Sequence, residues 1–414
     1  MPFLTSGRVA LACLLLLGLV GCDARTPSAA PTTSRGPGAP TVGSVPSSLI
    51  PTSLVPTLTD PPAPQACPWE PEPALAERFD PDGNRPLSSI LSTGGDLVAL
   101  ADDRAFHRVE GRWTTRTLGA SHATGLARHG HDLIAVDESE ILRFKGTRWR
   151  RDKVPQARNA VYLADAAGST GGDRNAWAVG FRSTNAGDRI VVWRYRGGAW
   201  RAVKGPDLGG GSIQRLDGVT ADGDGMMAVG VVETRKGGQP LLLRFDGTRW
   251  TRPRLVAPEG STWTEINAIT RIGDRSFAVG EAWTPEGLEA VAYVSDDRRT
   301  WRAVAVPQPG ERGERQFGPP IGPTLLSVGG TQADTYAVGE YSTPHPRGGG
   351  ELLEVGFIVR WNGTGFTQEE LAADPGEQDP ILLNDIATGL TSDGDEPVAV
   401  GLYGNGAFIA RRSC

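Results

Sequence analysis

The sequence predicts an all-β protein, a seven-bladed β-propeller of four-stranded antiparallel blades, and three observations lead to this prediction. A four-residue pattern, any residue followed by Ala-Val-Gly or a close variant, occurs seven times at intervals of 36 to 62 residues. A second apolar segment and a tight turn with an aromatic residue behind it follow most copies. Helical periodicity is confined to short segments. Such repeats are typical of propeller blades. The seven copies are 98–101, 134–137, 177–180, 227–230, 277–280, 336–339 and 398–401.

The N-terminus has the anatomy of an export signal. Arg8 precedes an apolar run of 12 residues, 9–20, which is too short to span a bilayer as a helix. The sequence 19–22, Leu-Val-Gly-Cys, resembles the lipobox of bacterial lipoproteins. This resemblance implies cleavage after residue 21, lipidation of Cys22, and a protein held on the outer side of a bacterial cell membrane by its lipid. The alternative is an ordinary signal peptide, 1–21, with a cysteine there by chance.

A tether and a folded domain are predicted to follow. Residues 22–66 are rich in Pro, Ser and Thr, and 23–65 contain no aromatic side chain. Such a composition cannot bury enough apolar surface to fold, so we expect a disordered tether with a reach of about 100 Å. Residues 67–414 are expected to form the propeller.

Charge and motifs exclude several function classes. Residues 1–66 carry a net charge of +1 and residues 67–414 a net charge of −7, which argues against nucleic acid as a partner. The sequence contains no phosphate-binding glycine loop, nucleophile elbow or zinc-ligand spacing. We therefore expect no cofactor and no metal. His129 and His131 are predicted to lie exposed in a turn without a third ligand. A monomer is expected.

The fourth repeat shows the predicted strands of a blade in order. An apolar segment at 216–219 comes first, and 227–230 forms the second strand. The third strand, 241–245, is followed by an Asp-Gly turn at 246–247 and by a fourth strand that starts near Trp250. Short apolar runs separated by Gly and Asp turns indicate hairpins. The tryptophans that recur at the position of Trp250 are expected to pack between blades.

The last repeat ends after its third strand, so its fourth strand must come from elsewhere. When Trp69 is placed at the position of Trp250, Cys67 and Cys414 fall on adjacent positions of one turn. We therefore predict a ring closed by an N-terminal strand and a Cys67–Cys414 disulfide, which an extracytoplasmic location permits. The alternative is a pair of buried, unlinked thiols.

The order of apolar strand, Ala-Val-Gly strand, third strand and Asp-Gly-x-x-Trp turn resembles two related groups of propellers. These are the Asp-box (BNR-like) propellers and the photosystem II stability and assembly factor-like repeats. The nearest match to an Asp box is 294–301, with Asp296, Thr300 and Trp301 in place. In that family the boxes are structural turns, so the resemblance implies a fold rather than an activity.

A candidate binding face follows from the topology of a blade. The connections between second and third strands, at 181–190, 231–240, 281–289 and 340–356, are predicted to be long loops on one face. Loops on a rigid scaffold often carry binding residues, and we expect a protein, glycan or cell-wall ligand to bind here. The candidate residues are Arg182, Arg235, Trp283, Glu286, Tyr341, His345 and Arg347.

Two acidic residues on this face leave an enzymatic alternative open. Glu281 and Glu340 each directly follow Ala-Val-Gly in adjacent repeats, and paired carboxylates hydrolyse glycosides. The equivalent positions of other repeats hold Phe181, Val231 and Leu402, which does not favour this role. A non-enzymatic binding or scaffold module is therefore the favoured hypothesis, and a sialidase-like glycoside hydrolase or lyase is the alternative.

Overall fold

The computed structural model divides the chain into two units, Met1–Ala66 and Cys67–Cys414. It describes residues 69–71, 87–92, 96–110, 112–120, 122–154, 161–169, 175–209, 211–310, 312–313, 321–344, 352–369, 371, 381–391, 394–403 and 406–412. All of these belong to the second unit. No helix among the described residues has the length and apolar character needed to cross a membrane.

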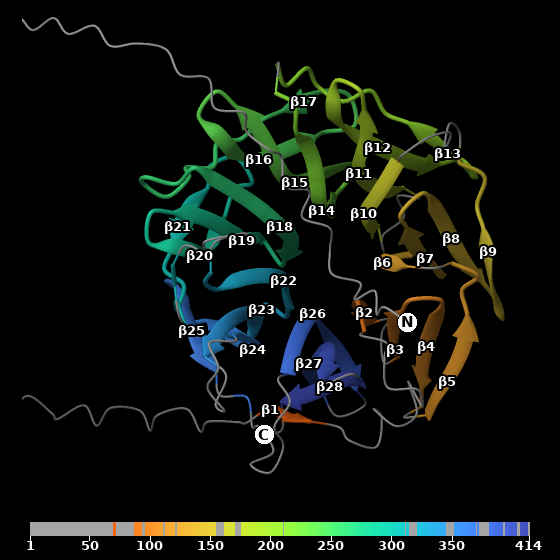
Figure 1. The fold of residues 1–414 in the computed structure, drawn as a ribbon. Helices are drawn as coiled ribbons and strands as arrows, with labels where there is room; N and C mark the ends of the chain where they lie inside the picture. Colours follow the sequence, from red (N-terminus) through yellow and green to blue (C-terminus); the bar gives the residue numbers. More distant parts are fainter. Residues whose placement is uncertain are drawn as a thin grey trace, which may run out of the picture. The chain divides into compact units, whose positions relative to one another are not determined.

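The second unit is an all-β propeller built from four-stranded antiparallel sheets, as the sequence predicts (Figure 1). The described strands form seven such sheets; six pair neighbouring strands in sequence order, and in the seventh β1 pairs with β28. Four sheets are β2–β5 (Ser89–Ser92, Leu97–Ala101, Arg104–Val109, Arg112–Thr117), β6–β9 (Ala123–His129, Asp132–Asp137, Glu140–Lys145, Arg148–Arg151), β10–β13 (Val161–Gly168, Ala176–Thr184, Gly187–Arg196, Ala199–Ala202) and β14–β17 (Gln214–Asp222, Gly225–Thr234, Gly237–Phe245, Trp250–Thr251). The others are β18–β21 (Trp263–Ile272, Arg275–Thr284, Gly287–Ser295, Arg302–Val304), β22–β25 (Thr324–Gly330, Thr335–Pro344, Leu352–Trp361, Phe366–Glu369) and β26–β28 (Ile381–Thr391, Gly394–Tyr403, Gly406–Arg412) with β1 (Trp69–Pro71).

The Ala-Val-Gly pattern forms the buried second strand of each sheet. Ala228 and Val229 of β15 are fully buried, and the matching pairs in β11, β19, β23 and β27 are buried as well. The glycine is needed because the first strand of the same sheet passes very close. A Cβ atom on Gly180 would lie only 1.9 Å from the carbonyl oxygen of Tyr162. The pattern is therefore repeated because of backbone packing, and it does not indicate a ligand site.

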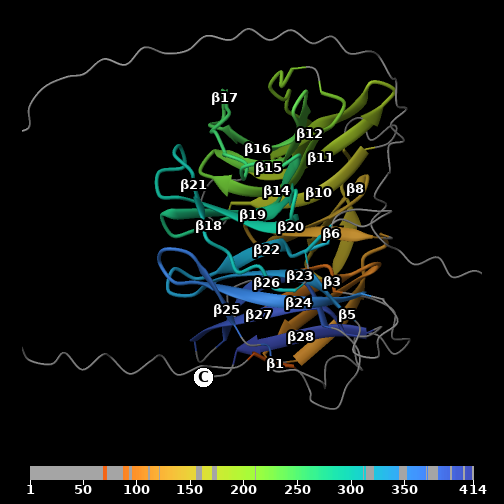
Figure 2. The same ribbon diagram turned by 60° about the vertical axis from the view of Figure 1, so that its left-hand side comes forward.

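The first strands of the sheets lie side by side around the centre of the propeller (Figures 1 and 2). They contact one another in the order β2, β6, β10, β14, β18, β22 and β26, and β26 also contacts β2. Six of them, all except β2, contain a register shift of the β-bulge type against the second strand. A bulge turns side chains at that point toward the neighbouring strand. These strands therefore decide what lines the central channel.

The recurring aromatic residue of the fourth strand packs between neighbouring sheets, as predicted. Trp149, Trp200, Trp301 and Phe366 are all less than 9% exposed. The indole N–H of Trp200 donates a hydrogen bond of 2.9 Å to the Asp152 carboxylate, which belongs to the preceding sheet. These side chains therefore join one sheet to the next.

The strand β1 lies at the outer edge of the sheet formed by β26, β27 and β28. Trp69 pairs with Arg412 in the same register that pairs Trp250 with Phe245 in the fourth sheet. Its indole is fully buried and lies edge-on against Tyr336, with ring centroids 5.3 Å apart. The predicted disulfide partners, Cys67 and Cys414, lie outside the described residues.

The long loops that the sequence predicts between second and third strands are largely absent from three sheets. Strands β11, β15 and β19 continue to a threonine, and only two residues separate each from the next strand. The threonine hydroxyl donates to the carbonyl of the glycine that opens the next strand, as Thr234 does to Gly237 at 3.1 Å. Gly237 has a φ of 95°, which a side chain opposes. The Thr-x-x-Gly sequence therefore makes a hairpin where a loop was expected.

Candidate functional site

The three extended hairpins, together with the starts of the first strands beside them, define what we call the hairpin face. Their tips are residues 185–186, 235–236 and 285–286. Two of the hairpins are hydrogen-bonded to the segment that leads into the next sheet: the backbone N–H of Asp188 donates to Ser212 at 2.7 Å, and that of Leu288 to Ile321 at 2.9 Å. These two hairpins are thus held rigidly, which suits a binding surface.

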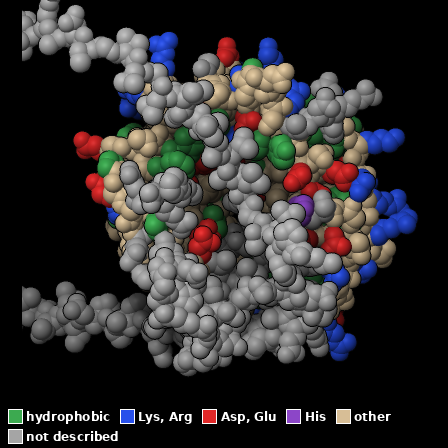
Figure 3. Space-filling view, in the orientation of Figure 1, with side chains coloured by type: hydrophobic (Ala, Val, Ile, Leu, Met, Phe, Trp, Pro, Cys, Tyr) green, Lys and Arg blue, Asp and Glu red, His purple; other side chains and the backbone are tan. Residues whose placement is uncertain are grey.

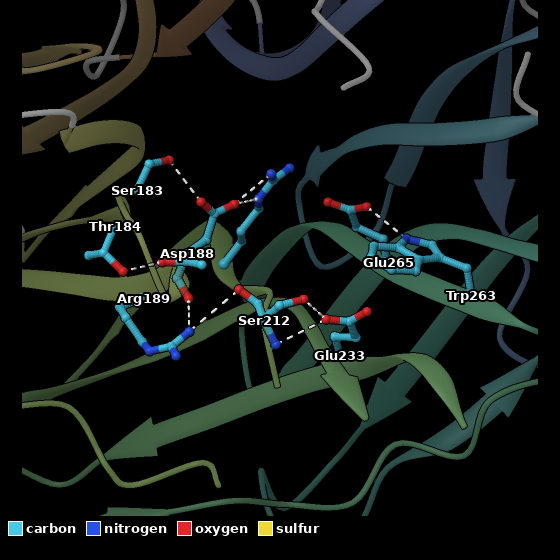
Figure 4. Close-up of polar contacts among 10 residues, drawn as sticks. Ser183, Thr184, Asp188, Arg189, Ser212, Glu233, Trp263 and Glu265 are labelled. Atoms are coloured by element: carbon cyan, nitrogen blue, oxygen red, sulfur yellow. Dashed lines mark hydrogen bonds and ion pairs between the residues drawn. The ribbon is translucent and has the colours of Figure 1, made fainter. Parts of the chain in front are cut away.

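Two tryptophans and two glutamates face one another across the hairpin of β18 and β19. Trp263 is the register partner of Trp283, and Glu265 is the register partner of Glu281. The two indole rings lie 5.9 Å apart between centroids at an angle of 35°. Each indole N–H donates to the glutamate of its own strand, at 3.1 Å for Glu265 (Figure 4) and 3.3 Å for Glu281. All four side chains are half-buried. We call these four residues the Trp–Glu patch.

A second cluster lies on the hairpin of the third sheet. Tyr162 stacks on Phe181 with ring centroids 5.1 Å apart, and the Arg215 guanidinium lies 4.6 Å from the centre of the Phe181 ring. The Asp188 carboxylate accepts from Nε of Arg215 at 2.6 Å and from the Ser183 hydroxyl at 2.8 Å. Figure 4 shows the Asp188 carboxylate and its hydrogen bond with Ser183. Tyr162 is 41% exposed, so its ring is accessible from solvent.

A glutamate of the fourth sheet stabilises the segment between these two clusters. Glu233 accepts hydrogen bonds from both the backbone N–H, at 3.0 Å, and the hydroxyl of Ser212 (Figure 4). Arg189 donates to the carbonyl oxygens of Asp188, Gly211 and Ser212, at 2.7, 3.1 and 3.4 Å. Glu233 and Arg189 therefore hold backbone segments of the hairpin face in place through hydrogen bonds.

The structure brings together only part of the predicted binding set. Arg182, in β11, and Arg235 and Glu286, at two hairpin tips, are exposed on different sheets. Glu281 and Trp283 lie two residues apart in β19. They pair in register with Glu265 and Trp263, which the sequence analysis did not select.

The remaining candidates concern the sixth sheet. Glu340 and Tyr341 lie in β23, where Glu340 pairs in register with Thr324. The Tyr341 ring packs edge-on against Phe357 at 5.9 Å and belongs partly to the core. His345 and Arg347 lie outside the described residues.

The sequence analysis missed Trp263 and Glu265, although a signal for them was present. Trp263-Thr-Glu265 and Glu281-Ala-Trp283 are mirror images of each other. In an antiparallel hairpin, mirrored sequences place like residues opposite one another on one face. The signal becomes readable only once the register of the two strands is known.

The prediction for the histidine pair was wrong for His129. This residue ends β6 and is only 9% exposed, and its ring lies edge-on against Tyr195 at 5.2 Å between centroids. The exposed turn therefore starts one residue later, and His131 is exposed in it. No cluster of three or more metal-ligating side chains occurs among the described residues.

The assignment of the Asp-box carboxylate to Asp296 was wrong by one residue. Asp297 accepts hydrogen bonds from the backbone N–H groups of Arg299, at 2.8 Å, and Thr300, at 2.7 Å. Asp296 instead pairs with Nε of Arg275 at 2.7 Å. A carboxylate that accepts from the backbone N–H groups two and three residues ahead closes such a turn. The turn therefore begins one residue later than the Asp-box pattern predicts.

The same arrangement occurs in two other turns between third and fourth strands. Asp246 accepts from the N–H groups of Thr248 and Arg249, and the side-chain oxygen of Asn362 accepts from the N–H groups two and three residues ahead. The hydrogen bond from Arg249 is the main cause that lowers the pKa of Asp246 to about 2. The bond from Thr300 does the same for Asp297. These turns are structural and offer no site.

A cavity of about 870 Å³ lies at the opposite end of the central channel. Its wall is formed mainly by the second halves of β6, β10, β14 and β18, near the turns that lead to the second strands. None of the described residues that were selected from the sequence is among those that line it. The described lining residues are Leu91, Ser92, Leu126, Ala127, Arg128, Ala166, Ala167, Gly168, Ser169, Val219, Thr220, Ala221, Gly223, Ile269, Thr270, Arg271 and Thr331.

Comparison with known proteins identifies no family. No protein-family model matches the chain, and no curated protein matches it. Among solved structures, YCF48 bound to D1 peptide is similar with a TM-score of 0.48 and 13% identity, over 84% of this chain and 98% of that chain. The WD40 β-propeller domain of Doa1 has a TM-score of 0.45 at 6% identity, over 80% and 94%.

A sialidase is similar to a comparable degree. Trypanosoma rangeli sialidase in complex with the inhibitor DANA has a TM-score of 0.42 and 10% identity, over 79% of this chain and 55% of that chain. Likenesses at this level concern the fold alone. We therefore argue function from the geometry of this chain.

Proposed function

We propose that this chain is a non-enzymatic binding module that holds a basic polypeptide segment on its hairpin face. The observation that carries the proposal is the Trp–Glu patch. Its two carboxylates occupy directly opposite positions, where like charges repel each other. Two carboxylates on one face offer hydrogen-bond acceptors to the Lys or Arg side chains of a ligand.

The indole rings add a second reason to favour a cationic ligand. A Lys or Arg side chain over the face of a tryptophan is attracted by the ring, and tryptophans often dominate binding energy at protein interfaces. The overall negative charge also favours a cationic ligand, since residues 67–414 carry a net charge of −7. In the view of Figure 3, acidic side chains lie near the middle of the face and most Lys and Arg side chains project from its periphery.

The proposal extends to parts of the chain outside the described residues. We infer a signal peptide, lipidation at Cys22 and a tether that holds the propeller outside a bacterial cell membrane. This inference rests on the sequence at 19–22 and on the composition of 22–66. Mass spectrometry of the mature protein tests it: a diacylated N-terminal Cys22 is expected, and an unmodified N-terminus elsewhere contradicts it.

We further propose that the seven sheets are the blades of one monomeric ring, in which β1 completes the last blade. The pairing of β1 with β28 and the contact between β26 and β2 support this arrangement. A Cys67–Cys414 disulfide would lock it. A non-reducing peptide map should contain one cross-linked peptide with both cysteines, whereas two free thiols in the exported protein would exclude the bond.

Glycoside hydrolysis is the second candidate function, because Glu265 and Glu281 are opposed carboxylates on one face. Retaining glycosidases hold two carboxyl groups about 5–5.5 Å apart. A panel of chromogenic glycosides, with sialosides included, tests this candidate. Turnover that is lost in Glu281→Gln would favour the enzyme, and no turnover would favour the binding module.

Binding is tested with a decamer of lysine and a decamer of glutamate, measured by tryptophan fluorescence on residues 67–414. We expect saturable binding of the lysine decamer only, with binding weakened at least tenfold, about 1.4 kcal/mol, by Glu281→Gln or Trp283→Ala. Glu286→Gln is the matched control, because it removes the same charge from a hairpin tip outside the patch. Equal effects of Glu281→Gln and Glu286→Gln would mean nonspecific attraction and would refute the proposal.

A further inference from the structure

The cavity at the other end of the channel combines positive charge with hydroxyl groups. Two of its described lining residues are arginines, Arg128 from β6 and Arg271 from β18, and none is acidic. Hydroxyl groups come from serines and threonines on several strands. These are Ser92, Ser169, Thr220, Thr270 and Thr331.

The two arginines occupy equivalent positions in their sheets and are held in the same way. In β6 regular pairing resumes at Gly125 after the bulge, and Arg128 lies three residues later. In β18 it resumes at Ala268, and Arg271 again lies three residues later. Nε of Arg128 donates to the carbonyl oxygen of Gly130 at 3.0 Å, and Nε of Arg271 donates to that of Gly273 at 3.0 Å. Because Nε is used, the N–H groups of the two terminal nitrogens remain as donors in a fixed plane. In Figure 1, β6 and β18 lie on opposite sides of the channel.

Among the described groups that pair with Asp222 and Arg271, positive charges outnumber negative ones. The buried Asp222 accepts from Nε of Arg244 at 2.8 Å and from Nη1 of Arg298 at 2.5 Å, and Nη1 of Arg271 lies 3.9 Å away. One carboxylate thus faces three guanidinium groups. A second acid that pairs with Arg271 is Asp274, which is 4.0 Å away and fully exposed, so water screens it.

Arg128 makes no ion pair with any of the described residues. It therefore contributes a whole positive charge to the cavity wall. Arginine recognises carboxylate through two parallel N–H donors, and charge-assisted hydrogen bonds of this kind are stronger than neutral ones. The lining hydroxyls can both donate and accept, which suits a ligand that carries hydroxyl groups of its own.

We propose that this cavity binds a small hydroxylated carboxylic acid, with Arg128 and Arg271 as the groups that bind its anionic end. A volume of about 870 Å³ lies within the range of about 300–1,000 Å³ that is usual for small-molecule sites. This site lies at the opposite end of the channel from the Trp–Glu patch and does not depend on the function proposed for that patch.

Isothermal titration of residues 67–414 with D-glucuronate and with D-glucose tests the proposal, since the two probes differ by the carboxylate. We expect saturable binding of glucuronate with a Kd below about 1 mM, and at least tenfold weaker binding of glucose. Arg128→Gln and Arg271→Gln should each weaken glucuronate binding at least tenfold. Arg150→Gln is the matched control, because Arg150 is an exposed arginine on the outer strand β9.

Three results would overturn the proposal. They are glucose binding as tight as glucuronate binding, unchanged glucuronate binding in Arg128→Gln, and no saturable binding up to about 10 mM. Arg128→Gln is the decisive variant because Arg128 has no ion-pair partner among the described residues, so its loss should leave folding intact. Circular dichroism and thermal unfolding check this. Trp283→Ala should bind glucuronate normally, which separates this site from the hairpin face.

Discussion

The Asp165 carboxylate in β10 accepts a hydrogen bond of 2.9 Å from the backbone N–H of Val219, which belongs to the first strand of the next sheet. Its other oxygen accepts from the N–H of Ala166 at 2.7 Å. The bulges in the first strands leave backbone groups without partners in their own sheet, and such groups need a bond from elsewhere. Side chains in or just before the first strands donate to a backbone carbonyl of the next sheet in three other places. These are Ser88 to Ala123 O, Thr124 to Leu163 O and Asn267 to Leu325 O.

Replacement of Asp165 by alanine should lower the free energy of unfolding by about 1–3 kcal/mol, because the N–H of Val219 would lose its partner. Urea denaturation followed by tryptophan fluorescence measures this change. Asp274→Ala is the control, since Asp274 is fully exposed and should change stability by less than about 0.5 kcal/mol. Equal stability of the two variants would mean that the bond between sheets contributes nothing.

The hairpin glycines should not tolerate a side chain. A Cβ atom on Gly237 would lie 2.0 Å from the carbonyl oxygen of Thr262, and φ is 95°. Gly237→Ala should therefore cost more than Gly197→Ala, where φ is 62° but no atom lies within 4 Å. For Gly197→Ala only the left-handed backbone is penalised, by about 1–2 kcal/mol. Thermal unfolding of both variants provides the comparison, and similar losses would contradict the close approach.

The Arg143 guanidinium is a buried charge whose loss should be costly. Its side chain is 2% exposed, it pairs with Asp152 at 2.5 Å, and it lies 3.7 Å from the centre of the Tyr195 ring in the next sheet. Arg143→Met should lower stability by about 3–5 kcal/mol, because an uncompensated carboxylate would remain. Arg150→Met, on the exposed side of β9, should have little effect. Chemical denaturation of the two variants decides the matter.

His107 should make stability depend on pH. Burial, with a smaller effect from the Arg116 charge, lowers the pKa of His107 from 6.5 to about 4 in the folded state. The unfolded chain therefore binds more protons than the folded chain between these values. Stability from this residue is complete well above pH 6.5 and falls as the pH drops to 4, by about 3 kcal/mol.

His107→Phe should remove this dependence while it preserves the packing against Phe144, whose ring lies 4.6 Å away. The measurement is the free energy of unfolding at pH 7 and at pH 5. The variant should lose less stability than the parent over this interval, whereas His131→Gln, an exposed control, should behave like the parent. An identical pH dependence in His107→Phe and the parent would show that other groups cause it.

The sequence predicted the fold well because the fold follows from repeated local patterns. The Ala-Val-Gly strand is recognisable since the close approach at Gly180 and its equivalents requires glycine in each copy. The position of Trp69 opposite Arg412 was also predictable, because a fixed register carries one aromatic residue per fourth strand. The hairpins were missed, although the threonine and glycine of Thr234-x-x-Gly237 mark them.

The candidate site was predictable only in part. Glu281 was selected because it follows Ala-Val-Gly, and Trp283 because it lies in a predicted loop. Their partners Glu265 and Trp263 lie on another strand. The register that pairs them includes a bulge between Ile266 and Ala268, which shifts the alternation of side chains by one residue. No pattern in the sequence locates that bulge, so the patch could not be assembled from sequence.

The sequence by itself determined the class of fold and the order of its strands, because periodic burial and turn residues act over a few neighbouring positions. The tertiary structure alone decided which side chains meet at the centre. Arg128 and Arg271 are far apart in sequence and belong to different sheets, yet both line one cavity. Both line it because the first strands of several sheets lie side by side at the centre of the propeller, and that arrangement depends on how whole sheets pack against one another.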